Sequence, residues 1–155
     1  MSTAMRRRLA ARCRPLESGS AVVEFVFLTV LLMVPLFYLV MTVSRVQAGS
    51  YAASTAAREA GRAYVTARDQ DSAEERAHAA ARVAFEDQGF GPADAQLAIV
   101  CDGTPCLRPE GRVEVTTTVV VPLPLVPSFA RRVVPLDVPI TASHVAVVDR
   151  FRGER

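Results

Sequence analysis

The longest hydrophobic run in the chain lies near its N-terminus. The segment Phe25–Ser44, FVFLTVLLMVPLFYLVMTVS, contains 20 residues and no charged side chain. Because a helix rises about 1.5 Å per residue, this run spans roughly the 30 Å of a bilayer core. It is longer than the apolar region of a secretory signal peptide, which is commonly about 7–15 residues. We therefore predict a transmembrane helix over residues 20–44, after a leader over residues 1–19.

Residues 45–91 have the pattern of helices rich in small side chains. The first helix is expected to continue from the membrane to about Arg68. The capping-box pattern Ser72-Ala73-Glu74-Glu75 then predicts a second helix, which stops at Gly89. Small residues recur at every fourth position in two adjacent stripes, and such faces let another helix approach closely. Packing on a domain of the same chain explains the stripes equally well, so both interpretations stay open. The stripes are Ala48, Ala52, Ala56 and Ala60, and beside them Gly49, Ala53, Ala57 and Gly61.

Beyond Pro92 the hydrophobic period changes to two, which is the period of strands that bury one face. Apolar residues alternate over Leu97–Cys101, Val113–Val121 and Leu136–Val148. Three strands after a long N-terminal helix and a second short helix indicate an α+β fold with a small antiparallel three-stranded sheet. We assign residues 92–155 to this small β domain.

Residues 121–135 are rich in apolar side chains, but their four prolines exclude a regular strand throughout. An apolar loop commonly covers the core of its own domain, as a lid. The alternative is a contact surface for a partner or for the membrane surface, with Arg131 and Arg132 at its rim. The sequence does not choose between these two interpretations.

Charge is divided unevenly along the chain, whose formal net charge is +2. Residues 1–19 contain five arginines and one acid, and the remainder contains 13 arginines and 15 acids. A basic groove that follows nucleic-acid phosphates is therefore not expected. The positive-inside rule instead predicts a cytoplasmic leader and an extracytoplasmic C-terminal part.

The three cysteines fall on the two sides of the predicted span. Cys13 lies in the leader, on the reducing side, whereas Cys101 and Cys106 lie outside, where a disulfide persists. These two bracket Asp102-Gly103-Thr104-Pro105, which is a turn sequence. We therefore predict a Cys101–Cys106 disulfide.

No sequence motif indicates catalysis or metal binding. The chain contains neither a G-x-S-x-G elbow nor a Walker loop, and His78 and His144 belong to no cluster with metal-ligand spacing. We expect a protein that is not an enzyme, with no metal, no cofactor and no small-molecule substrate.

The segment Gly19–Phe25, GSAVVEF, resembles the prepilin-peptidase site of type IV-like pilins. In such sites a glycine precedes the cleaved bond, and a glutamate and an aromatic residue follow it. Residues 17–25 and the apolar helix after them are more particularly similar to TadE-like proteins, which are pseudopilins of the tight-adherence (Flp) pilus system. The likeness continues in Val46–Ala48, Arg58–Ala63 and Ile140–Ser143.

The resemblance implies a pilin-like subunit that a prepilin peptidase cuts between Gly19 and Ser20. Glycine at this position lets a protease approach the backbone closely. The implied partners are that peptidase, other pseudopilins or pilins, and the proteins of the pilus assembly platform. The implied place is the inner (cytoplasmic) membrane, in a single pass, in or at the base of a pilus.

Glu24 has two interpretations, and Phe25 is the aromatic residue that follows it in the motif. By the resemblance, cleavage leaves an ammonium group on Ser20, one helical turn from Glu24. This group could pair with Glu24 of a neighbouring subunit and set the register, because a wrong stagger leaves both charges unpaired in apolar surroundings. Alternatively, Glu24 only occupies the first turn of the helix, where an acid complements the helix dipole.

Two other functions compete with the pilin interpretation. The first is an uncleaved, membrane-tethered extracytoplasmic binding domain, which would gain nothing specific from Glu24. The second is a secreted protein released near Ala48, because Val46-Gln47-Ala48 is a weak small-residue cleavage site.

Overall fold

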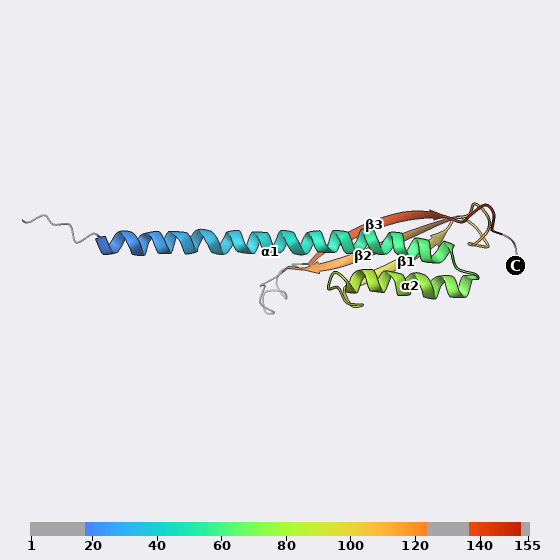
Figure 1. Cartoon of the computed structure of the whole chain (residues 1–155), viewed down its shortest axis with the longest axis horizontal. Helices are drawn as coiled ribbons and strands as arrows, with labels where there is room; N and C mark the ends of the chain where they lie inside the picture. Colours follow the sequence, from blue (N-terminus) through green and yellow to red (C-terminus); the bar gives the residue numbers. More distant parts are fainter. Residues whose placement is uncertain (1–17, 124–136, 153–155) are drawn as a thin grey trace, which may run out of the picture. The chain divides into compact units, whose positions relative to one another are not determined.

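The computed structural model describes residues 18–123 and 137–152. The elements are the helices α1 (Ser18–Val65) and α2 (Gln70–Glu86), and the strands β1 (Ala95–Cys101), β2 (Arg112–Pro122) and β3 (Asp137–Val147) (Figure 1). This arrangement confirms the predicted α+β fold. Residues 1–17, which include Cys13, and residues 124–136, which include most of the apolar segment, lie outside the described residues. The chain divides into two compact units, Met1–Leu39 and Val40–Arg155.

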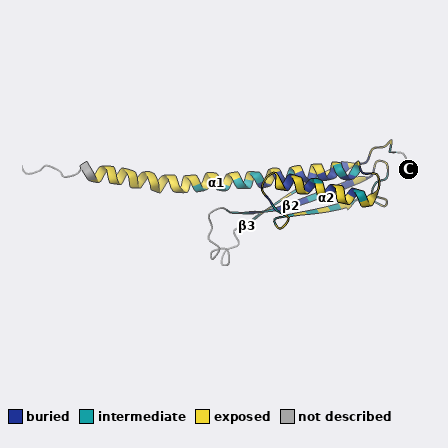
Figure 2. Cartoon of the chain, turned by 60° about the horizontal axis from the view of Figure 1, so that its bottom comes forward, coloured by how far each residue is buried: buried dark blue, intermediate teal, exposed yellow. Residues whose placement is uncertain are grey.

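The described part of the first unit is a helix without a packing partner. Every residue from Ser20 to Phe37 is exposed, although most of these residues are apolar (Figure 2). Among the described residues, α1 is the one helix that is long and apolar enough to cross a membrane. Full exposure of an apolar surface is costly in water and favourable in lipid, so α1 is a candidate membrane span.

The three strands form one antiparallel sheet in the order β1-β2-β3, so β2 is the central strand. In the register, Thr117 of β2 lies between Leu97 of β1 and Ala142 of β3. The predicted alternation is confirmed, because one face of β2 is buried and supplies most of the large core side chains of the sheet. These buried residues of β2 are Val113, Val115, Thr117, Val119 and Val121.

The small-residue stripes of α1 pack on this sheet. A Cβ atom on Gly49 would collide with the Val121 side chain, and one on Gly61 would lie 3.2 Å from the Ala146 Cβ. Between them, the buried hydroxyl of Thr117 donates a hydrogen bond of 2.8 Å to the carbonyl oxygen of Ala53. Of the two uses left open for the stripes, the structure therefore shows packing on a domain of the same chain. Side chains of ordinary size would hold the helix too far from the sheet for this bond.

The start of α2 differs from the prediction. The N-cap is Asp69, whose carboxylate accepts a 2.9 Å hydrogen bond from the backbone N–H of Ser72, so the capping-box assignment to Ser72 was wrong by three residues. The backbone and side-chain hydrogen bonds from Ser72 lower the pKa of Asp69. The preceding helix, α1, ends at Val65 rather than at Arg68. The chain turns after α2 near Gly89, which has a φ of 74°.

Arg152 closes the C-terminal end of α1 from a distant part of the chain. Its Nη1 donates to the Val65 carbonyl oxygen at 3.1 Å, and its Nη2 donates to those of Ala67 and Arg68 at 2.6 and 2.8 Å. The last carbonyl groups of a helix lack partners within the helix, and a cation also complements the negative end of the helix dipole. Arg152 therefore fastens the C-terminal segment to the end of α1.

We predict that Arg152→Ala lowers the free energy of unfolding of the second unit by about 2 kcal/mol, because carbonyl oxygens lose a charged donor. Arg152→Lys should recover part of this loss, since a lysine cannot reach all three oxygens in the same fork. Thermal unfolding of the full chain in detergent micelles, followed by circular dichroism, measures both. Equal stability of the Ala variant and the wild type would contradict the prediction.

We also predict that Gly49→Leu destabilises the second unit by about 1–3 kcal/mol, because the added side chain overpacks the contact with β2. The matched control is Ser50→Leu at the adjacent exposed position of α1. Denaturation of both variants under the same conditions separates overpacking from the general effect of a new leucine. Similar losses in the two variants would show that the close approach at Gly49 is unimportant.

Candidate functional site

The predicted processing bond lies at the start of α1. The helix begins at Ser18, so the bond between Gly19 and Ser20 is part of its first turn. Ser20 is exposed. Because the first four N–H groups of a helix have no partner within the helix, this turn is held by fewer backbone hydrogen bonds than the middle of α1.

Glu24 lies in the second turn of α1, on the same side of the helix as Ser20. The helix has no acidic residue in its first turn, so the interpretation of Glu24 as a first-turn acid is wrong for this structure. The Glu24 side chain is exposed, and none of the described residues forms an ion pair with it. A lone carboxylate on an apolar helix surface is therefore left without a partner within the described part of the chain.

Phe25 follows directly and is 69% exposed, in the continuous apolar surface of the first unit. Its carbonyl oxygen accepts a 2.8 Å hydrogen bond from the hydroxyl of Thr29, one turn later. This bond satisfies the threonine within the helix, as lipid surroundings require. Between residues 24 and 37, Glu24 is therefore the polar side chain that has no partner among the described residues.

The predicted disulfide joins Cys101 to Cys106, with a Cα–Cα distance of 5.4 Å. It closes the turn that follows β1, at the end of the sheet where β2 begins. Asp102 strengthens the same turn, because its carboxylate accepts from the Arg112 backbone N–H at 3.0 Å and pairs with the Arg108 Nη2 at 3.0 Å. The bridge therefore belongs to a cross-linked turn.

Tyr64 connects this turn to the end of α1. The tyrosine is almost fully buried, and its hydroxyl lies 3.8 Å from the Cys101 Sγ. Burial, followed by the negative charge of Glu74, raises the pKa of Tyr64. The hydroxyl is therefore neutral at physiological pH, and it acts as a structural contact.

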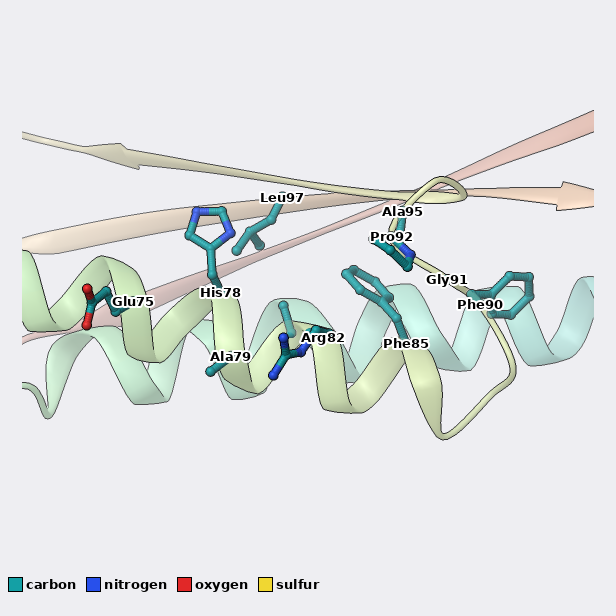
Figure 3. Close-up of a pocket in the computed structure, with 11 residues that line it drawn as sticks. Glu75, His78, Ala79, Arg82, Phe85, Phe90, Gly91, Pro92, Ala95 and Leu97 are labelled. Carbon is teal, nitrogen blue, oxygen red and sulfur yellow. The ribbon is translucent and has the colours of Figure 1, made fainter.

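A cleft of about 460 Å³ lies between α2 and β1 (Figure 3). Phe85, Ala95 and Leu97 form its apolar part, and Glu75, His78 and Arg82 lie on the α2 side. His78 and Arg82 are exposed, and the three polar side chains form no catalytic arrangement of nucleophile, base and orienting group. The second histidine, His144, is half-buried in β3, and no three metal-ligating side chains cluster within the described ranges.

Two contacts between distant residues were missed from the sequence. Arg45, the first charged residue after the apolar run, places its guanidinium 5.1 Å from the ring centre of Phe90. The other is the Arg152 cap described above. The signal for Arg45 was its position, because a cation at the end of a membrane span commonly marks the interface. The aromatic partner lies 45 residues away in sequence and has no local signal.

One family model matches part of the chain. The family model described as TadE-like protein matches residues 19–62, from the glycine of the predicted processing bond to the last turn of α1. This match confirms the resemblance to TadE-like proteins of the tight-adherence pilus system. No curated protein and no solved structure matches the chain.

We predict that reduction of the disulfide, or the double change Cys101→Ser and Cys106→Ser, lowers the free energy of unfolding by about 2 kcal/mol. So short a loop constrains the unfolded chain only modestly. The matched control is Cys13→Ser, which should leave stability unchanged. Thermal unfolding with and without reductant tests this, and an effect of reductant on the double-serine variant would contradict it.

Proposed function

We propose that this chain, TadE-like over residues 19–62, is a pseudopilin of a tight-adherence pilus system. A prepilin peptidase would cut it between Gly19 and Ser20, and the product would act without catalysis in pilus assembly at the cell membrane. The observation that carries the proposal is the family match, which begins at Gly19 and continues through the helix. The described residues supply no competing catalytic arrangement.

The exposed surface of α1 supports a membrane location. From Ser20 to Phe37 no side chain of the described residues packs against the chain itself, so this surface is free for lipid or for other helices. The basic leader and the positive-inside rule favour a cytoplasmic N-terminus. The Cys101–Cys106 disulfide supports an oxidising compartment for the second unit.

The unpaired carboxylate of Glu24 supports a role in register. After cleavage, Ser20 would carry a positive ammonium group one turn below Glu24 on the same helix face. In a bundle of such helices, the ammonium of one subunit would pair with the carboxylate of the next. A shift along the helix axis would leave two charges unpaired in lipid, which costs several kcal/mol even though the pair itself adds little stability.

We predict that the protein extracted from its native membranes begins at Ser20. N-terminal sequencing and intact mass measure this directly. The processed chain should also contain no free thiol, because Cys13 leaves with the leader and the other two cysteines are bridged. Gly19→Val should leave the chain uncut, with one free thiol, because the added side chain keeps the peptidase from the backbone.

An uncut chain in cells with an active prepilin peptidase would instead favour the tethered extracytoplasmic binding domain. A chain that begins near Gly49 would indicate a secreted protein. Either result would overturn the proposal.

We predict that Glu24→Leu leaves membrane insertion and cleavage intact but reduces co-purification with other pilus components at least tenfold. Glu24→Gln should behave in the same way, since the charge rather than the shape is required. The matched control is Thr29→Leu, which removes the next polar residue of the span and should not affect assembly. Normal co-purification of the Glu24→Leu variant would refute the role of Glu24 in register and would favour a membrane-tethered domain.

A further inference from the structure

The sheet has two free edges, and they run in the same direction. Both β1 and β3 are antiparallel to β2, so they are parallel to each other. Both strands also run in the same direction as the part of α1 that belongs to the second unit. Gly49 lies against Ile140, and the later residue Gly61 lies against Ala146, which is further along β3. No described segment pairs with the outer edge of either strand.

The backbone groups at both edges point outward in the pattern that another strand requires. The hydrogen bonds from Val120 to Asp94 and from Asp102 to Arg112 show that the even-numbered residues of β1 bond to β2. In an antiparallel ladder bonded and non-bonded pairs alternate, so Leu97 and Ile99 direct their N–H and C=O groups to the free edge.

The bond from the Val148 N–H to the Gly111 oxygen sets the same alternation for β3. There the odd-numbered residues, including Thr141, Ser143 and Val145, point away from β2.

Neither edge carries the usual protection against another strand. Proteins commonly protect a free edge with charged residues, prolines or bulges. All seven residues of β1 (Ala95–Cys101) are uncharged, and residues 140–147 of β3 contain neither an acid, nor an arginine, nor a proline. Pro139 interrupts only the beginning of β3.

The two edges match each other when two copies lie side by side without a shift along the strands. The register places Ala95 level with Ile140, Leu97 level with Ala142, and Ile99 level with His144, so the first two of these inner-face pairs combine a large and a small side chain. On the outer face, Val100 of β1 is level with Val145 of β3, and these valines are 62% and 51% exposed in a single chain. The other level pairs of the outer face are Gln96 with Thr141, and Ala98 with Ser143.

The cleft between α2 and β1 offers room beside one of these edges. It lies on the inner side of the sheet, where Ala95 and Leu97 line it (Figure 3). Side chains on the inner face of a strand added to β1 would project toward this space. Such a strand would therefore cover apolar surface that one copy leaves open.

We infer that β3 of one copy adds to β1 of a second copy of this chain and continues the sheet in a parallel arrangement. The inference rests on the proposed assembly of copies of this chain, in which the second units of neighbouring copies share one orientation, so that β1 of one lies parallel to β3 of the next. Two β3 edges related by a two-fold axis along the strands would present the same residues at the same level, without the stagger that parallel bonding needs. The β1–β3 contact is heterologous, so it repeats from one copy to the next.

Disulfide trapping between two differently tagged copies tests this contact in native membranes. One copy carries Ala98→Cys and the other carries Ser143→Cys, both in a Cys13→Ser background. These exposed positions are level on the outer face and, in the added strand, lie about 5 Å apart. Within a single copy they are separated by β2 and lie about 10 Å apart, too far for a disulfide.

We expect mild oxidation to give the mixed dimer at least tenfold more than the control pair Ala98→Cys with Thr116→Cys. Thr116 is level with Ala98 and Ser143 on the central strand, where a neighbour's edge cannot reach it. A single chain with both Ala98→Cys and Ser143→Cys should give a ladder of higher oligomers. A control pair that links equally well, or dimers of Ala98→Cys with itself in equal amount, would overturn the inference.

Substitution of a residue of β3 by lysine gives a second test of the contact between copies. Val145→Lys in the copy with Ser143→Cys should reduce the mixed dimer at least fivefold, because it places a charge beside Val100 of the neighbour. Val145 is exposed, so the fold should tolerate the change. Undiminished cross-linking would count against the contact.

N-terminal sequencing of the cross-linked band separates this inference from the proposed processing. A band that begins at Met1 would preserve the sheet contact and refute cleavage by the peptidase. A chain that begins at Ser20 without the mixed dimer would preserve processing and refute the sheet contact.

Discussion

The close approach of α1 to the central strand is the contact on which the second unit depends. The buried face of β2 is made of valines and one threonine, and α1 meets it with glycine and alanine. The absence of larger side chains lets the Thr117 hydroxyl reach the Ala53 carbonyl oxygen inside the helix. Because packed interiors tolerate little change of volume, a larger residue at Gly49 or Gly61 would move the helix and disturb the whole layer.

α1 contributes residues to both units of the chain. Its first part is apolar and exposed on all sides, as a helix in lipid would be, and its second part is amphipathic, with small residues toward the sheet and polar residues outward (Figure 2). The change falls near Arg45, whose contact with Phe90 attaches the loop after α2 to the helix.

Among the described residues, helices cover one side of the sheet and none covers the other. The inner face builds the core, while no described segment pairs with the two edges. The proposed contacts through the first part of α1 and through the sheet edges would involve different units of the chain. Together they would constrain the orientation of neighbouring copies more strongly than either contact alone.

The elements with a repeating pattern could be predicted from the sequence. The uncharged run predicted the exposed part of α1, the period of two predicted the strands, and the turn between Cys101 and Cys106 predicted the disulfide. The motif GSAVVEF and the apolar run indicated the resemblance to TadE-like proteins, because both are local in the chain. These features depend on neighbouring residues, and a sequence displays neighbours directly.

Other features could be read only from the tertiary structure, because they depend on residues far apart in the sequence. The sequence left the small-residue stripes with two uses, and the contact with Val121 selected packing on the sheet. Asp69, rather than Ser72, is the N-cap of α2, and α1 ends at Val65 rather than near Arg68. Arg152 reached the end of α1 across more than 80 residues. Periodicity fixes which face of an element is buried, but the partner of that face is set by long-range packing, for which a single sequence carries no local pattern.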